Sequence, residues 1–400
     1  MLHAPTDQEL DLIHQIQEYS RSEFIVFRLT KTMLKKSIID ANKHIVRLFR
    51  EQGLFDYSTA IDGEIYKVKC DILTQSGLRN TVCSCYRPKA KPHKPGDPRF
   101  LPYALKKACG EGDLIYVEIK DSTLVVIPVS ESIITTESLQ YYFGEQESPH
   151  AAQVEKIKTI ISSIKDVWIV SVSAKKKNDK DVGETLEKYL GIDANSSKKA
   201  DIDGVLELKS KRKESRTDST LFCKVPIPSL TPLKKVKHII LEHGYQSRSP
   251  KRPGYTSLYV TVSSKPNNQG FYHKVDRNKE QLAQYRVKGS GEHILVAVWT
   301  FDVLKKSLYD KHPATAWVKA EETKIDGTIH FKYNELEITE QPIFEKFLIG
   351  LETDRIIFNW RGEQPPKDGE GSVIDYGHAF RLNSNTATSF LFGKSETIQI

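Results

Sequence analysis

The stretch ADIDGVLELKS, residues 200–210, decides which fold the chain is expected to adopt. Residues 205–209 alternate in the manner of a short strand, which places Glu207 and Lys209 on the same face. Asp201 lies in the turn before this strand, close enough to share one cation with Glu207. Two acids and a lysine at this spacing suit a magnesium-dependent phosphodiesterase.

The chemistry explains why these residue types belong together. Mg²⁺ prefers oxygen ligands, and one or two carboxylates with waters and a phosphate commonly complete its shell. The metal lowers the pKa of the attacking water, and a neighbouring lysine such as Lys209 orients or deprotonates that water. Asp203 is an alternative to Asp201 as the first ligand. A surface strand with a solvated Glu/Lys pair would have the same sequence pattern, so the functional interpretation of the motif needs support from the rest of the chain.

Length and composition indicate an ordinary globular protein. The 400 residues exceed what one hydrophobic core usually supports, so we expect two or three domains. The longest apolar runs, such as 294–300, are too short to cross a bilayer, and the first residues do not have the pattern of a secretory signal. The five cysteines are unclustered, and Cys83-x-Cys85 differs from the CxxC spacing of zinc sites, so reduced cytosolic thiols are expected.

The distribution of positive charge points to a polyanionic partner. The net charge is +7 and the pI is about 8.8. Lysine and arginine gather at 175–177, 198–199, 209–216, 234–237 and 248–252, on both sides of the motif. Such runs are usually solvated faces, but a nucleic acid is the partner that this arrangement predicts best.

Residues 1–150 have the pattern of a small β-rich domain. Strand-like runs at 24–29, 66–72, 81–86, 113–120 and 124–129 accompany one basic helix expected over 34–50. The proline-rich loop at 86–99 carries cations that either reach DNA or remain solvated, namely Arg87, Lys89, Lys91, Lys94 and Arg99.

Residues 151–400 alternate helical and strand-like patterns, which predicts an α/β domain with a mixed sheet. Helices are expected at 154–167, 183–191, 301–308 and 342–351, and strands at 168–172, 219–225, 255–263, 291–300, 328–333 and 356–360, with a strand-rich end at 379–392. Glu187 lies on the helix before the motif. A helix docked on the motif strand could turn Glu187 towards the same metal, which would give three carboxylates and a lysine.

The arrangement of Glu187, Leu190-Gly191, Asp201 and the Glu-Leu-Lys of residues 207–209 resembles the PD-(D/E)xK nucleases. Within them it is most similar to the MutH-like branch that contains the MvaI/BcnI restriction endonucleases. The resemblance implies a restriction-endonuclease-type mixed sheet over 151–400, with Asp201 and Glu207 as Mg²⁺ ligands and Lys209 and Glu187 as further catalytic residues. The proline usual before the first acid is Ala200 here. Asp201 fits the family spacing better than Asp203.

The resemblance continues downstream and implies which residues contact DNA. Arg248 and Arg252 lie in a segment similar to the one after the family's catalytic hairpin. Residues 353–355 and 376–381 look like the two segments that family members place in the DNA grooves. Arginine suits guanine recognition, so the implied base readers, with their neighbours, are Arg355, Arg381, Tyr376 and His378. The family usually has histidine where Tyr376 stands, and His378 alone fits a core or turn histidine equally well.

The first domain is similar to the effector-binding N-terminal domain of EcoRII-type enzymes, a DNA-binding pseudobarrel. The likeness rests on the strand at 24–29, the basic helix and the segments at 85–87 and 96–99. It implies two basic arms in the major groove. Residues 30–36, which include Lys35, form one arm, and residues 87–99 form the other.

Together these features predict a monomeric, prokaryotic, cytoplasmic type II restriction endonuclease that uses Mg²⁺. Its two domains would bind double-stranded DNA at two sites, with a CCWGG- or CCSGG-like target and a cognate DNA methyltransferase as partner, and no membrane contact. Alternatives are a modification-dependent or MutH-like nicking endonuclease, and a DNA-binding regulator with an inactive nuclease domain. The intact Asp201, Glu207 and Lys209 set argues against the regulator.

Overall fold

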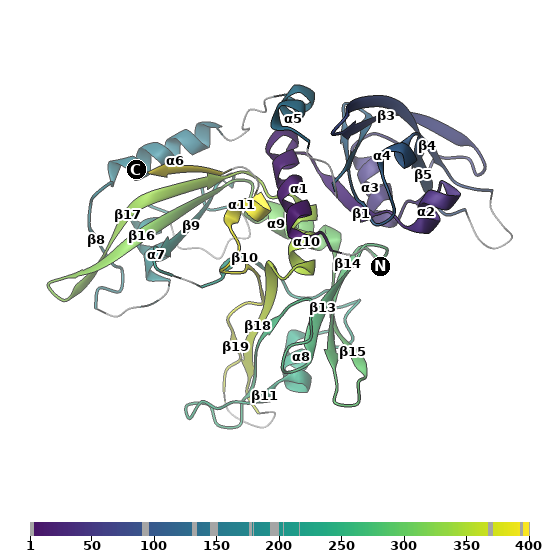
Figure 1. The fold of residues 1–400 in the computed structure, drawn as a ribbon. Coiled ribbons are helices and arrows are strands. Elements are labelled where there is room, and N and C mark those ends of the chain that lie inside the picture. Colours follow the sequence, from purple (N-terminus) through teal and green to yellow (C-terminus); the bar gives the residue numbers. More distant parts are fainter. Residues whose placement is uncertain are drawn as a thin grey trace. The chain divides into compact units, whose positions relative to one another are not determined.

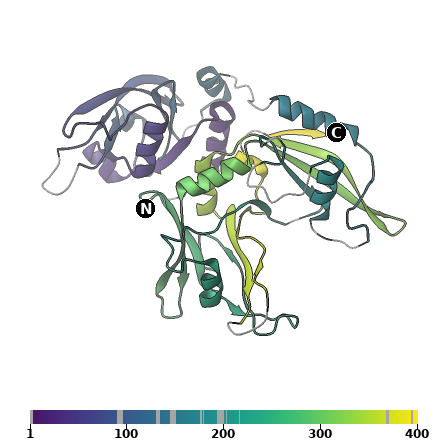
Figure 2. The same ribbon diagram turned by 180° about the vertical axis from the view of Figure 1, so that it is seen from behind.

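The computed structural model divides the chain into two units, which we describe separately (Figures 1 and 2). Unit 1 comprises Met1–Gln146 with Val275–Gln281, and unit 2 comprises Glu147–Lys274 with Leu282–Ile400. The structure describes residues 4–89, 96–129, 134–144, 151–175, 178, 180–192, 200–202, 204–215, 217–366, 371–392 and 395–399. Lys91, Lys94 and Asp203, all named above, lie outside the described residues.

Unit 1 is built on a mixed sheet whose described strands run in the order β1-β6-β7-β3-β4-β5-β2. β3 pairs parallel with β7, whereas the other neighbours pair antiparallel. The strands are β1 (Phe24–Arg28), β2 (Ile39–Asp40), β3 (Ile65–Thr74), β4 (Gly77–Tyr86), β5 (Arg99–Pro102), β6 (Leu114–Lys120) and β7 (Thr123–Pro128). The helices are α1 (Asp7–Ser20), α2 (Lys31–Lys36), α3 (Lys43–Glu51), α4 (Leu105–Ala108) and α5 (Thr136–Phe143).

The single basic helix predicted over 34–50 is wrong, because the chain breaks it into α2, β2 and α3. Ser37 adopts a left-handed conformation that ends α2. Asn42 then caps α3 by accepting a hydrogen bond from the backbone N–H of Ile45 at 2.9 Å. Between the two helices, Ile39 pairs with Phe100 on β5, so a tertiary strand pairing overrides the helical pattern of the sequence.

A buried polar network joins α1 to β6 in unit 1. The Glu118 side chain is fully buried and accepts a hydrogen bond from the Ser20 hydroxyl at 2.5 Å and another from the Tyr116 hydroxyl. Gln17 donates to the Tyr116 oxygen at 2.5 Å. Burial raises the pKa of Glu118 to about 7, against the opposing effect of the two hydroxyl donors.

Unit 2 contains three sheets in its described residues. Their strand orders are β21-β17-β16-β9 with β8 paired to β17, β10-β20-β18-β12-β11 with β19 paired to β18, and β13-β14-β15. The strands are β8 (Ile169–Val170), β9 (Glu207–Arg212), β10 (Ser219–Cys223), β11 (Tyr245–Gln246), β12 (Thr256–Val262), β13 (Phe271–Asp276), β14 (Gln281–Val287), β15 (His293–Thr300), β16 (Thr315–Ile325), β17 (Thr328–Thr339), β18 (Ile356–Gln364), β19 (Ile374–Asp375), β20 (Ala379–Leu382) and β21 (Ser395–Gln399). The helices are α6 (Ala151–Ser163), α7 (Asp181–Tyr189), α8 (Val236–His243), α9 (Phe301–Lys311), α10 (Phe344–Glu352) and α11 (Thr388–Phe392).

The sheet that carries the motif strand packs one face against α6 and α7. Ile161 of α6, Leu186 of α7 and Leu208 of β9 belong to one buried hydrophobic cluster with β16 and β17. β9 lies at the edge of this sheet and pairs parallel with β16, with Glu207 opposite Thr315. The mixed α/β sheet expected for this part of the chain is therefore confirmed. The strand β16 itself was not predicted from the sequence.

None of the helices in the described parts of the chain combines the length and the apolar character that a membrane span requires.

Candidate active site

A short hairpin fixes Asp201 beside the motif strand. The backbone N–H of Ile202 donates to the carbonyl of Leu206 at 2.9 Å, and Gly204 adopts the positive φ of 71° that this tight turn requires. The backbone N–H of Leu208 then donates to Oδ2 of Asp201 at 3.0 Å. One carboxylate oxygen of Asp201 is thereby held by the backbone, and Oδ1 remains for other contacts.

Glu207 and Lys209 lie next to each other at the start of β9. The Glu207 side chain has no exposed surface, whereas 30% of the Lys209 side chain is exposed. The Lys209 Nζ lies 2.5 Å from Oε1 of Glu207. A buried carboxylate thus faces a lysine that reaches solvent, which is the environment in which a lysine can hold a water molecule at a metal site.

Lys311 is a member of this site that sequence reasoning missed. It is the last residue of α9, and its Nζ lies 2.9 Å from Oε2 of Glu207 and 3.5 Å from Oδ1 of Asp201. The next residue, His312, is fully buried and lies within hydrogen-bond distance of the Thr315 hydroxyl and the Leu221 carbonyl, both at 2.9 Å. Thr315 is opposite Glu207 across the parallel strands, so the contact of His312 with Thr315 holds the neighbouring Lys311 close to the carboxylates.

The electrostatics of the site follow from burial of charge. Burial, together with the negative charge of Asp201, raises the pKa of Glu207 to about 7, against the opposing effect of the Lys209 and Lys311 ammonium groups. Burial alone would lower the pKa of Lys311, but the two carboxylates raise it above its usual value. The paired acids therefore require nearby positive charge to remain ionised.

Glu187 lies within electrostatic range of the pair but is not a third contact to it. It stands on α7, half-buried, and burial followed by the charge of Asp201 raises its pKa. In the parts of the chain that the structure describes, no three His, Cys, Asp or Glu side chains come together as a metal cluster. The metal-binding candidates are thus Asp201 and Glu207 as a pair.

This pair fits Mg²⁺ by its donor chemistry. Both side chains supply hard oxygen atoms, and the ammonium of Lys311 already lies between them. Mg²⁺ is commonly held by one or two carboxylates, with water and substrate phosphate supplying the remaining oxygens. A divalent cation would take over the charge balance that Lys209 and Lys311 provide in this structure.

A second cluster of predicted site residues forms around β18 and β19. Arg252 donates to Oε2 of Glu363 at 2.7 Å, and hydrogen bonding to Glu363 and then to Tyr376 raises the pKa of Arg252. The Tyr376 side chain is 52% exposed and lies beside the ring of Tyr259 and under the guanidinium of Arg361. The structure thus brings Arg252 and Tyr376 together and adds residues that the sequence did not suggest.

His378 is buried rather than displayed with Tyr376. Only 1% of it is exposed, and its ring packs against Trp360 with centroids 4.9 Å apart. Nδ1 lies 3.3 Å from the backbone N–H of Arg361, and Nε2 lies 3.6 Å from Oδ1 of Asp375. These contacts hold the turn that presents Tyr376.

The two arginines implied as base readers lie on different elements. The Arg381 guanidinium donates to the Asp218 carbonyl at 2.5 Å and to Oδ1 of Asn359 at 3.4 Å. Burial lowers the pKa of Arg381, against the charge of Asp218. Arg355 follows α10 and lies over the ring of Phe390.

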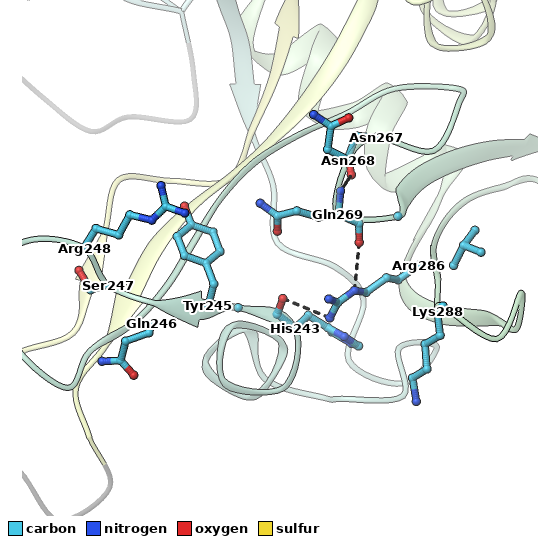
Figure 3. Close-up of a pocket in the computed structure, with 14 residues that line it drawn as sticks. His243, Tyr245, Gln246, Ser247, Arg248, Asn267, Asn268, Gln269, Arg286 and Lys288 are labelled. Atoms are coloured by element: carbon cyan, nitrogen blue, oxygen red, sulfur yellow. Dashed lines mark hydrogen bonds between the residues drawn. The ribbon is translucent and has the colours of Figure 1, made fainter.

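Arg248 lies apart from both clusters, at a cavity of about 1290 Å³ in unit 2 (Figure 3). This cavity is lined by the end of α8 and the segment after it, by the residues just before β13, and by the end of β14 with the residues that follow it. Figure 3 shows Arg248 beside Tyr245 at one side, and Arg286 between the carbonyls of Gln269 and His243 at the other. None of the active-site carboxylates lines the cavity.

Some of the predicted DNA contacts of unit 1 are bonded to other parts of unit 1, and others are exposed. Arg87 donates to the carbonyls of Gly96 and Tyr57, so its guanidinium holds its own loop. Arg99 lies on β5, where it pairs with Asp40 at 3.2 Å. The lysines of the predicted arms that the structure describes are exposed, namely Lys31, Lys35 and Lys36 on α2 and Lys89 after β4.

The mixed sheet of unit 2, with an acid–lysine site at the start of β9, defines the class of restriction-endonuclease-type DNA nucleases. A model of the MvaI/BcnI restriction endonuclease family matches residues 154–391, and the chain belongs to this family. It is therefore a site-specific DNA nuclease, and the family predicted from the sequence is confirmed.

One solved structure agrees with the fold. A restriction endonuclease MvaI–cognate DNA substrate complex is 21% identical, with a TM-score of 0.52, and the match covers 63% of this chain and 99% of that one. Restriction endonuclease MvaI in the absence of DNA is 20% identical, covers 64% and 99% of the two chains, and has a TM-score of 0.40. A comparison with curated proteins found no match. The pseudobarrel expected for residues 1–150 stays a prediction.

Proposed function

We propose that this nuclease is a type II restriction endonuclease that hydrolyses double-stranded DNA at a short specific site with Mg²⁺. The observation that carries the proposal is the buried Glu207 carboxylate, paired with Asp201 and faced by Lys209 and Lys311. All four residues lie in the part of the chain that the family model matches.

In this mechanism the chain supplies the ligands, the charge balance and the position of the water. Asp201 and Glu207 would hold Mg²⁺, which when bound neutralises charge on the scissile phosphate and acidifies water. Lys209, partly exposed beside Glu207, orients the attacking water and receives or relays its proton. Lys311 offsets the negative charge of the two acids, and Glu187 supports the site from α7.

DNA recognition is assigned to the residues implied by the family resemblance. Arg355 and Arg381 would read guanine edges. The exposed Tyr376, beside Arg252 and with His378 supporting its turn, would be a further DNA contact. Arg248 and Arg252 would contact the phosphate backbone. The MvaI structure is described as a cognate DNA complex, and by analogy we propose a CCWGG- or CCSGG-like target for this chain.

Unit 1 is proposed to be a pseudobarrel that binds a second DNA copy. Exposed Lys35 and Lys89 would contact phosphates, while Arg87 donates to the Gly96 carbonyl and Arg99 pairs with Asp40. A second DNA site suits effector-assisted cleavage, in which binding at one site favours cutting at the other. The proposal includes a monomeric enzyme in a prokaryotic cytoplasm, with a methyltransferase that protects the same target.

Plasmid cleavage tests this function directly. The full chain is incubated with plasmid DNA and Mg²⁺, and the ends of the fragments are sequenced. We expect a discrete fragment pattern with one common sequence at the ends, and no cleavage in EDTA. If relaxed circles are the only product, the protein is a nicking endonuclease and the proposal is wrong. If only methylated plasmid is cleaved, the protein is a modification-dependent endonuclease. Failure to cut any of these plasmids with Mg²⁺ would favour a non-catalytic DNA-binding protein.

A further inference from the structure

A groove of about 620 Å³ begins at Lys209 and runs along β9. We call it the β9 groove. Its floor is formed by β9 and β16, and its walls by Ser215 and residues 217–220, 382–384 and 386–389. Its lining is rich in lysine and hydroxyl side chains, including Lys209, Lys211, Lys213, Lys319, Ser215 and Ser389. The groove is therefore an extension of the candidate active site.

A row of lysines runs along this floor. Because side chains on a strand alternate between faces, Lys211 lies on the same face as Lys209, and Lys213 continues the row just beyond the strand. Lys319 of β16 stands directly opposite Lys211 in the parallel pairing. Like charges in directly opposite positions destabilise a sheet. Glu335, directly opposite Lys319 on β17, offsets the charge of Lys319 at 2.5 Å, so Lys211 is the lysine of this pair that an anion in the groove would serve.

The acidic residues of the groove are already engaged elsewhere. Asp218 accepts a hydrogen bond from the backbone N–H of Ser384 at 2.9 Å, and Glu337 accepts one from Thr388 at 2.5 Å. Outside the lining, Glu335 pairs with Lys319 at 2.5 Å. Burial lowers the pKa of Lys211, and Arg381 and Lys319 lower it further against the charge of Asp218. Lys211 is thus a partly buried lysine, with Asp218 as the main opposite charge near it and Arg381 and Lys319 as like charges.

Lys211 and the hydroxyl side chains give the groove a donor-rich surface. The Lys211 ammonium uses one of its donors on the Thr217 carbonyl. An ammonium group has three donors, so others remain for a ligand. Hydroxyls from both walls, including Ser215 and Ser389, line the same space. Phosphate oxygens commonly accept hydrogen bonds from this mixture of lysine and hydroxyl groups in protein–DNA contacts.

We propose that the β9 groove binds the phosphates of the cleaved DNA strand that adjoin the scissile phosphate, with Lys211 and Lys319 as their main contacts. This rests on the proposed function, which puts the scissile phosphate at Asp201, Glu207 and Lys209. Alternate residues of a strand are roughly 7 Å apart, a spacing comparable with that of consecutive phosphates along a nucleic-acid strand. The lysine row therefore matches the repeat of its ligand.

The salt dependence of DNA affinity tests the contacts. Binding of a duplex that contains the cleaved site is measured by fluorescence anisotropy over a range of salt concentrations, with Ca²⁺ in place of Mg²⁺. Lys211→Met and Lys319→Met should each reduce the slope of log affinity against log salt by about 0.9, the value for one phosphate contact. Lys324→Met is the matched control, because this exposed lysine of β16 does not line the groove.

Neutral methylphosphonate linkages identify which phosphates are bound. In the wild-type protein, one neutral linkage beside the scissile phosphate should weaken binding, and in Lys211→Met the same linkage should have no further effect. Equal losses in both proteins at every position, or salt slopes unchanged in both lysine variants, would overturn the inference. If the wild-type protein cuts plasmid but shows these results, the groove assignment fails alone. If it cuts no plasmid, the proposed function fails first.

Discussion

Replacing Lys311 with methionine tests the electrostatic account of the active site. In the structure the Lys311 ammonium lies 2.9 Å from Glu207 and 3.5 Å from Asp201. Lys311→Met keeps a long side chain at the end of α9 but removes the charge. The two carboxylates then face each other with Lys209 as the nearest remaining cation, so the metal-free protein should lose stability when both acids are ionised.

The magnitude follows from the burial of Glu207. Removing one partner of a buried charge pair costs about 3–5 kcal/mol. Because Lys209 stays 2.5 Å from Glu207, we expect the lower end, about 3 kcal/mol, at pH 8 without metal. For a domain the size of unit 2, this corresponds to a fall of roughly 6–12 °C in the unfolding midpoint.

The pH dependence has a definite sign. Burial raises the pKa of Glu207 to about 7, so folding favours the protonated acid and this group costs stability as pH rises from about 4.5 through 7. Loss of the Lys311 charge raises that pKa further and enlarges the cost. The deficit of Lys311→Met relative to wild type should therefore be large at pH 8 and small at pH 5.

Thermal unfolding in EDTA at both pH values, and at pH 8 with Ca²⁺, measures these deficits. Ca²⁺ should shrink the deficit at pH 8, because a divalent cation supplies the missing charge to Asp201 and Glu207. Lys324→Met, a change at an exposed lysine, should match wild type throughout. A Lys311→Met midpoint equal to wild type at pH 8, or a deficit that is the same at pH 5 and pH 8, would refute the reasoning.

Two further predictions concern the other polar clusters. Burial raises the pKa of Glu118 to about 7, so ionisation of this carboxyl should cost unit 1 about 3 kcal/mol as pH rises from about 4.5 to above 7. Glu118→Gln, which keeps an oxygen acceptor for Ser20 and Tyr116, should flatten that dependence in pH-resolved unfolding, and an unchanged slope would contradict it. Arg381→Met should keep DNA affinity for unrelated sequences but reduce cleavage preference for the target by roughly 10–100-fold. Competition between target and single-mismatch duplexes measures this preference, and an unaltered preference would contradict the prediction.

The sequence was sufficient to predict that the local residues of the candidate site lie together. Asp201 and Glu207 are joined by a hairpin of a few residues, with its turn at Gly204, so their proximity follows from strand and turn rules. Lys209 follows from the alternation of a strand. The helix that carries Glu187 follows from apolar spacing, because Leu186 packs into the core beside β9.

The rest depended on contacts between distant segments. Lys311 is 110 positions from Asp201 and has no motif around it; the parallel pairing of β9 with β16 brings it to the site. The contacts of Arg87 were not predictable for the same reason. Its basic character suggested a DNA contact, but its guanidinium donates to the carbonyls of Gly96 and Tyr57. Likewise, no local pattern distinguishes a buried His378 from a displayed one.

The most direct test of the central claim compares cleavage and binding in Lys209→Ala. Asp201→Ala provides a second variant, and Lys324→Ala provides a control outside the site. Plasmid cleavage with Mg²⁺ gives the rate, and anisotropy with Ca²⁺ gives DNA affinity. We expect both site variants to bind DNA within a few-fold of wild type while cleavage falls by roughly 100-fold or more. A Lys209→Ala or Asp201→Ala protein that cuts at the wild-type rate would contradict the assignment of the active site.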